Sequence, residues 1–416
     1  MVKISNIISI IVASSMLIFS LRGKFGAAVI TLLILILVMF QILNNKLKIS
    51  YCLYYSLFIV VFAVVSQYFR SSSFEYYLWV GYIAVSVILL NQNIEIYNKL
   101  WDILGGISII QALGIYIQWL LPSIYYSVIS IFLPSSVVMS IKNRMYSGYY
   151  TGFSREVSYT MFFIVVGLGI YFFDVIKYKD GIFNGKIKKY STIMFLFGSL
   201  LLSGKRATLI FFIISIFVIK FIDSRDRLKL LKYMLMILVF FIVVYVTYPL
   251  WSKIPSLTRI NELIEYVMTD NLIGITNGRV AIYEKAVDLW KTSPIFGIGW
   301  GNFKYAVSET LWYSGFDVHN CYLQVLCETG IVGAVIYYGL ILFAVYKFIK
   351  CIIMTRNCRD NKIALLAGFI QLFFCIYSVT EPILYEYTDY ILFFVSINIT
   401  SILIKDKIAI TKGVNK

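Results

Sequence analysis

Long apolar segments recur along almost the whole chain, and they constrain the fold more than any other feature. A helix of about 20 apolar residues is long enough to cross the hydrocarbon core of a bilayer. Of the 416 residues, 60% are hydrophobic and only 14% are charged, too few charges to cover a soluble protein of this size. We therefore predict an all-α integral membrane protein, a polytopic bundle of about 12 transmembrane helices. The predicted spans are residues 4–21, 25–43, 49–69, 76–91, 101–121, 156–174, 190–204, 207–222, 232–250, 320–346, 363–379 and 387–404.

The first apolar segment, which follows Lys3, could also be a secretory signal peptide. A signal peptide is followed by a small-residue cleavage site and a soluble domain, whereas residues 25–43 are apolar again. We interpret residues 4–21 as the first membrane helix. Residues 1–416 are then expected to form a single membrane domain.

The distribution of Lys and Arg predicts the orientation in the membrane. With the N-terminus inside, most basic residues fall in inside loops and in the C-terminal tail, which is typical of cytoplasmic segments. The net charge of +16 therefore indicates topology, and we expect no nucleic-acid partner. Two long loops remain on the outer side, at residues 122–155 and 251–318. The basic residues of the inside loops and the tail are Lys46, Lys48, Lys177, Lys179, Lys186, Lys188, Lys189, Arg225, Arg227, Lys229, Lys232, Lys347, Lys350, Arg356, Arg359, Lys362, Lys405, Lys407, Lys412 and Lys416.

The larger extracytoplasmic loop, residues 251–318, is predicted to be structured. Asn277 is of a type that caps helix N-termini and Pro294 cannot continue a helix, so we expect an amphipathic helix at about 278–291. Arg279 falls in its first turn. A cation there is poorly placed for the helix dipole, but helix N-termini also favour phosphate anions. A bound diphosphate would therefore stabilise Arg279 at this position.

His319 is the single histidine of the chain, and it stands where this loop ends and the next apolar segment begins. Imidazole is the side chain best suited to proton transfer near neutral pH. The positive end of the following helix and nearby arginines both disfavour the imidazolium form, so we expect a neutral ring able to accept a proton. Asn320 could orient it. The alternative is a structural histidine at the membrane interface.

Lys205 and Arg206 form a second cationic point on the predicted outer side, between two apolar segments. An ordinary hairpin turn whose cations extend into the headgroups would explain them. Cations held at a membrane face without an anionic partner are costly, however, so a functional site that binds an anion is the other interpretation. Both interpretations stay open from these two residues alone.

Three further charged positions are candidates for a supporting role. Arg155 and Glu156 end the first outer loop, where the simpler explanation is an ion pair within the loop that includes Arg144. Glu381, before Pro382, is predicted to open the last helix, where a carboxylate is favoured by the helix dipole.

Other motifs exclude several kinds of site. The six cysteines include no C-x-x-C pair, so neither a disulfide framework nor a zinc site is predicted. No Asp-x-Asp-like motif lies on the outer side, and we expect no metal and no cofactor. The segment Gly297-Ile298-Gly299-Trp300-Gly301 is similar to a nucleotide-binding loop, but it follows no predicted strand and is interpreted as a flexible turn.

Four short stretches carry a resemblance to a known family. They are Gly278-Arg279, Trp290-Lys291-Thr292-Ser293-Pro294-Ile295-Phe296-Gly297-Ile298-Gly299, His319-Asn320-Cys321-Tyr322-Leu323 and Glu328-Thr329-Gly330-Ile331-Val332-Gly333. Together they resemble the signature of the bacterial O-antigen ligase and Wzy-type polysaccharide polymerase superfamily. The firm resemblance covers residues 278–333, and a looser one extends upstream through Arg206 and residues 152–156.

The resemblance implies an inverting glycosyltransferase that uses a polyprenyl-diphosphate-linked glycan on the outer face of the bacterial cytoplasmic (inner) membrane. By position, His319 matches the catalytic base of the family, and Arg206 and Arg279 match the arginines that hold the diphosphate. Lys205 stands where members often have a small residue, so its phosphate contact is left open. The chemistry agrees, because guanidinium groups can stabilise a diphosphate leaving group without a general acid.

Three functions are weighed. The first is polymerisation of undecaprenyl-diphosphate-linked oligosaccharide repeat units into capsular, exopolysaccharide or O-antigen chains. Its expected partners are the lipid-linked substrate, membrane lipids, a flippase and a chain-length regulator. The second is a ligase that transfers finished glycan to lipid A core or another acceptor. The third is a transporter or lipid flippase, which would place ionisable residues along several helix interiors, whereas this chain gathers them at one face.

Overall fold

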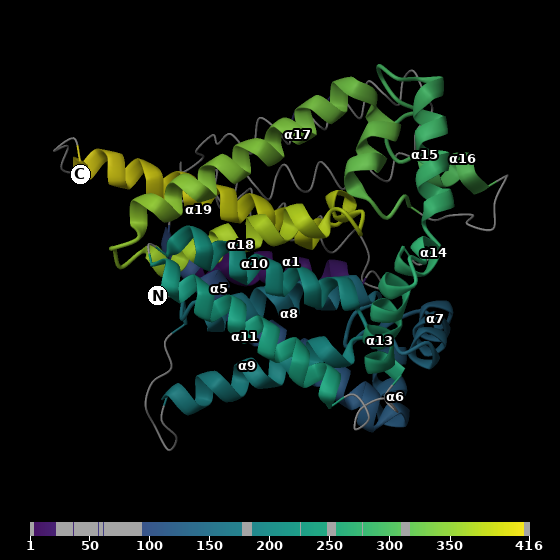
Figure 1. Cartoon of the computed structure of the whole chain (residues 1–416), viewed down its shortest axis with the longest axis horizontal. Helices are drawn as coiled ribbons and strands as arrows, with labels where there is room; N and C mark the ends of the chain where they lie inside the picture. The colour runs from purple at the N-terminus through teal and green to yellow at the C-terminus, as the bar shows by residue number, and fades with distance from the viewer. Residues whose placement is uncertain are drawn as a thin grey trace.

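All regular elements in the described part of the chain are helices (Figure 1). The structure is a computed structural model, and it describes residues 4–21, 36, 57, 61, 94–176, 185–224, 226–247, 255–276, 278–308 and 317–411. The predicted spans 25–43, 49–69 and 76–91 lie almost entirely outside the described residues.

Each predicted span within the described residues coincides with a helix. Among the described residues, three stretches are long and apolar enough to cross a membrane, namely Tyr97–Leu120, Cys321–Thr355 and Tyr387–Ile408. The described part of the chain is therefore all-helical, and the protein is membrane-embedded. The helices at these positions are α1 (Ile4–Leu21), α5 (Ile94–Leu120), α8 (Val157–Phe172), α9 (Gly185–Leu202), α10 (Arg206–Asp223), α11 (Arg227–Val246), α17 (Cys321–Thr355), α18 (Asn361–Tyr377) and α19 (Tyr387–Thr411).

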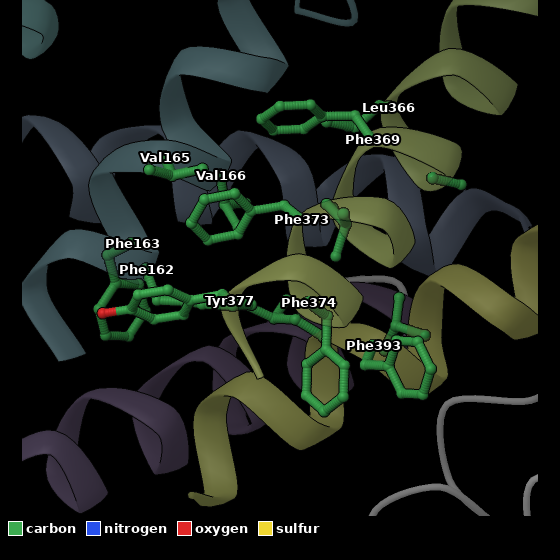
Figure 2. Close-up of a cluster of buried hydrophobic side chains, with 14 of the residues drawn as sticks. Phe162, Phe163, Val165, Val166, Leu366, Phe369, Phe373, Phe374, Tyr377 and Phe393 are labelled. Carbon is green, nitrogen blue, oxygen red and sulfur yellow. The ribbon is translucent and has the colours of Figure 1, made fainter. Parts of the chain in front are cut away.

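An aromatic core joins α8, α18 and α19 (Figure 2). The ring of Phe373 stacks on that of Tyr377, with 5.2 Å between centroids, and lies 5.7 Å from the ring of Phe162 in α8. Phe374 faces the other way and stacks on Phe393 of α19 at 4.1 Å. One helix thus presents rings to neighbours on two sides, which fixes its ends and the residues that follow them.

Short helices gather at one end of this bundle, at the right of Figure 1. The outer loop predicted at 122–155 contains two of them, and the helix expected at 278–291 begins at Val280 and ends at Thr292. Arg279, instead of Asn277, is the residue before its first turn, and Asn277 lies outside the described residues. These helices are α6 (Pro122–Phe132), α7 (Ser135–Tyr146), α13 (Pro255–Met268), α14 (Leu272–Ile275), α15 (Val280–Thr292) and α16 (Phe303–Ser308).

The opposite end of the bundle carries connections rich in basic residues. Asp174, after α8, forms ion pairs with Lys189 of α9 and Lys362 of α18. Arg356, after α17, donates to the main-chain carbonyl of Ile222. These links hold together the ends of α8, α10 and α17, so the predicted inside loops and the short-helix end lie at opposite ends of the same helices.

Helix α17 is broken near its start, and Figure 1 shows the bend. Gly330 has φ 63° and ψ −165°, a conformation that favours glycine. The main-chain NH groups of Ile331 and Val332 bond to the carbonyls of Pro294 and Ile295, 2.9 and 3.2 Å away. The segment after α15 therefore occupies the break and satisfies backbone groups that an uninterrupted helix would bond internally.

Candidate functional site

A cavity of about 630 Å³ opens at the short-helix end, and the predicted site residues converge on it. They come from the start of α8, the turn between α9 and α10, the approach to α15, the start of α17 and the segment after α18. These elements are distant in sequence, so their convergence is a product of the tertiary fold. The cavity is lined by Glu156, Lys205, Arg206, Arg279, His319, Asn320 and Glu381, but not by Arg155.

Glu381 forms the centre of a buried cation cluster. Its Oε1 lies 2.6 Å from Lys205 Nζ and 3.8 Å from Arg279 Nη2, and its side chain is only 7% exposed. Burial raises the pKa of Glu381, but the positive charges of Lys205 and Arg279 outweigh this, so the pKa is held below its ordinary value. The group is thus a carboxylate at neutral pH and a poor proton acceptor.

The expectation that Glu381 opens the last helix is wrong. A 3₁₀ turn, η1 (Ile383–Tyr385), follows Pro382, and α19 begins only at Tyr387. The carboxylate is therefore stabilised by side-chain cations and not by the dipole of α19.

Ser158 completes this cluster and was missed from the sequence. Its Oγ accepts from Lys205 Nζ at 2.7 Å and donates to Glu381 Oε2 at 3.1 Å. A serine two residues into a membrane helix has no distinctive spacing. Only the positions of the charged partners, Lys205 and Glu381, could have indicated it.

The two arginines are held by main-chain carbonyls. Arg279 Nη1 donates to the carbonyl of Thr380 at 2.8 Å. Arg206 donates to the carbonyls of Arg259 and Gly274 at 3.1 and 3.4 Å, and its guanidinium lies 5.8 Å from the ring centroid of Tyr266. Both guanidinium groups line the cavity.

His319 stands just before α17 in an unusual backbone conformation. Its φ is +55°, which costs a non-glycine residue about 1 kcal/mol or more, so the surrounding structure must hold it there. Burial first, and then the positive charge of Arg279, lower the pKa of His319 to about 4, although Glu381 opposes the shift. The ring is neutral at pH 7, as we expect of a base.

Asn320 has a different contact from the one expected. Its side-chain Oδ1 accepts from the main-chain NH of Leu323 at 3.1 Å, which makes it the N-cap of α17. It therefore fixes the start of the helix and acts on His319 only through the backbone.

Arg144 and Glu156 form the ion pair proposed as the simpler explanation for that loop. Both line the cavity. Arg155 does not, because it turns toward the next helix, where its Nη2 lies 3.4 Å from the hydroxyl of Tyr159. The adjacent residues Arg155 and Glu156 thus have different surroundings, and only Glu156 lines the cavity.

A second hollow, of about 420 Å³, adjoins the cavity along α7. Arg144 and Tyr149 line both spaces. Behind Tyr149, the guanidinium of Arg259 lies 4.1 Å from the ring centroid and also donates to the tyrosine hydroxyl. The other residues of the hollow are Ser136, Met139, Ser140, Asn143 and Ser147, a mostly polar face at helical spacing.

Comparison with known proteins identifies the region that holds these residues. Within the described part of the chain, no group of three or more His, Cys, Asp or Glu side chains is placed to hold a metal ion. No curated protein matches the chain. Residues 191–338 match the family model described as O-Antigen ligase, a segment that contains Lys205, Arg206, Arg279 and His319. This segment is similar to the O-antigen ligase-like superfamily, whose members are glycosyltransferase-like membrane enzymes.

Proposed function

We propose that this protein polymerises undecaprenyl-diphosphate-linked oligosaccharide repeat units on the outer face of the bacterial cytoplasmic membrane. The observation that carries the proposal is the meeting of fixed cations and one neutral imidazole in a single cavity. Among the described lining residues, four cations (Arg144, Lys205, Arg206, Arg279) and two carboxylates (Glu156, Glu381) leave an excess of two positive charges. A diphosphate diester carries about one negative charge per phosphate and would balance them.

The cavity also has an apolar side that suits a lipid carrier. Ile210 and Phe211 of α10 and Leu263 of α13 line it beside the cations. One turn further along α10, Ile214 is 40% exposed, so the apolar surface continues toward the membrane helices. A donor with a charged diphosphate and an isoprenoid tail would match both parts.

The proposed reaction needs one proton acceptor. The acceptor hydroxyl of one repeat unit attacks the anomeric carbon of another, whose bond to the diphosphate oxygen breaks with inversion. His319 takes the hydroxyl proton and later returns it to water, while Arg206 and Arg279 stabilise the charge on the leaving diphosphate. A bound diphosphate raises the pKa of His319 from about 4 toward neutrality, which makes it a better base in the complex.

A reconstituted reaction tests the proposal. Purified protein that is given only lipid-diphosphate repeat units should produce a ladder of longer lipid-linked glycans and free polyprenyl diphosphate, without nucleotide sugar or added metal. The His319→Ala variant serves as the blank. A ligase, the activity for which the matched family is described, would instead transfer once and only when another acceptor is added. Absence of any transfer, together with movement of the lipid between leaflets, would favour the flippase.

The hollow along α7 is proposed to hold sugars of the substrate, because serine hydroxyls, an asparagine amide and the tyrosine ring can all contact uncharged glycans. We expect Ser140→Trp to fill it and raise the KM for the lipid-linked donor about tenfold or more, with unchanged affinity for inorganic pyrophosphate. Ser127→Trp on α6, also exposed but outside the hollow, should behave as the parent protein. Equal KM values for the two variants would place the sugars elsewhere.

The outward position of the site is also a proposal, supported by the basic connections at the opposite end. In a variant without native cysteines, Thr269→Cys after α13 should react with a membrane-impermeant maleimide in intact cells. Asn357→Cys, between α17 and α18, should react only after the cells are permeabilised. Both positions are exposed, so access from each side decides the result. The reverse labelling would place the cavity in the cytoplasm.

A further inference from the structure

Glu328, in α17, is a fully buried carboxylate outside the cavity. It accepts four hydrogen bonds, two on each oxygen. The donors are the main-chain NH groups of Gly301 and Phe303, at 2.8 and 3.2 Å, the side-chain amide of Gln324, at 3.3 Å, and the hydroxyl of Tyr385. Four converging donors match the acceptor capacity of an ionised carboxylate.

One connection leads from Glu328 to the histidine. Gln324 Nε2, besides its bond to Glu328, donates to Asp317 Oδ1 at 3.1 Å. Its Oε1 accepts from the main-chain NH of Val318 at 3.3 Å. These contacts hold the two residues that immediately precede His319, whose left-handed backbone requires outside support.

Two other connections lead from Glu328 to the cation cluster. Tyr385 ends the 3₁₀ turn that follows Glu381, and its ring lies 4.9 Å from that of Trp300. The segment before Gly301 leaves the C-terminal end of α15, the helix that begins beside Arg279. Its position is tight, because a Cβ on Gly297 would lie 2.3 Å from the main-chain carbon of Glu328.

We infer that Glu328 is a positioning residue that fixes His319 relative to Arg279 and Glu381, by joining the three chain segments that carry them. The inference rests on the proposed transferase function. It assigns Glu328 no contact with substrate. Its carboxylate acts by accepting from donors on all three segments at once, so the loss of one acceptor site loosens the geometry of the reacting groups.

The test replaces one carboxylate oxygen with an amide group. In Glu328→Gln the new NH₂ faces the main-chain NH of either Gly301 or Phe303, so at least one contact is lost at nearly constant volume. We expect kcat for glycan transfer to fall about 100-fold, since small displacements of a reacting group have effects of this size. The Kd for inorganic pyrophosphate and the KM for the lipid-linked donor should change less than about threefold.

The pH profile separates positioning from general stability. In the parent protein kcat/KM should be constant from pH 8 to about 5, because the pKa of the buried His319 is about 4. In Glu328→Gln a displaced, more hydrated His319 has a pKa closer to its ordinary value of about 6.5, so kcat/KM should fall already between about pH 7 and 6. Gln324→Leu, which removes the connection from Glu328 to Asp317 and Val318, should give the same shift.

Gln371→Leu is the matched control, because Gln371 is another buried amide, bonded to Thr400 and absent from the cavity wall. It should leave kcat and the pH profile unchanged. If Glu328→Gln is poorly folded, Gln324→Leu alone decides, and a parent-like kcat and pH profile in that variant overturns the inference. Loss of pyrophosphate binding in parallel with kcat, at an unshifted profile, also overturns it. Failure of the parent protein to bind pyrophosphate or transfer glycan would instead reject the proposed function.

Discussion

Replacement of His319 by asparagine should lower the rate of glycan transfer by about 10²–10⁴-fold, the range expected for loss of a general base. Asparagine tolerates the left-handed conformation that His319 adopts, with φ +55°, but it cannot accept the acceptor proton. His319→Ala should be equally inactive, although alanine is strained at this φ. Transfer is measured with lipid-linked repeat units, and binding of inorganic pyrophosphate serves as the test of an intact cavity.

Comparison of the two variants separates the role of the imidazole as a base from the role of the backbone conformation at position 319. Both should retain the pyrophosphate affinity of the parent protein, because the cations that line the cavity are unchanged. If His319→Asn kept near-normal transfer while His319→Ala lost it, the backbone conformation would be the requirement and the base would lie elsewhere. Near-normal transfer in both would remove His319 from the reaction altogether.

Replacement of Arg279 by lysine should weaken pyrophosphate binding by about 10-fold to 150-fold, equivalent to about 1.5–3 kcal/mol for hydrogen bonds to a charged group. The guanidinium donates through Nη1 to the carbonyl of Thr380 while Nη2 lies 3.8 Å from Glu381. A lysine has the same charge, but its single ammonium group cannot reproduce this fork and also contact phosphate in two places. Titration calorimetry with pyrophosphate measures the loss.

Arg155→Lys is the matched control for that prediction. Arg155 is also an arginine of the short-helix end, but its side chain turns toward Tyr159 and does not line the cavity. Its replacement should leave pyrophosphate affinity and transfer rate within about twofold of the parent protein. Equal losses in the two variants would mean that total charge near the cavity, and not the geometry at Arg279, determines binding.

The sequence contained enough information to place the helices and the ends at which charged residues lie. An apolar run in a membrane forms a helix for a local reason, because each of its backbone groups must form a hydrogen bond within its own segment. The helices α8, α9, α10, α17 and α18 therefore occur where hydropathy predicts them. Because successive spans alternate in direction, the positions of Arg206 and His319 at span ends, and of Arg279 in the large outer loop, were enough to predict them on one side.

Contacts between these ends were beyond a sequence argument. The pairing of Glu381 with Lys205 and the bridging hydroxyl of Ser158 depend on how far each helix end extends beyond its neighbours in the bundle. The pattern of apolar residues does not determine how far each helix end extends. Arg155 shows the same limit, because its neighbour Glu156 lines the cavity while Arg155 turns toward Tyr159.

The sequence by itself determined that this chain is a membrane protein with a histidine and several cations at span ends, because hydrophobic transfer and charge exclusion act on each segment separately. The tertiary structure alone decided which of those groups share a cavity and what holds them. The break at Gly330 admits the segment after α15 into α17, and Glu328 can then accept from three distant segments. Such an arrangement arises only when distant segments pack together, so neither the periodicity nor the composition of the sequence indicates it.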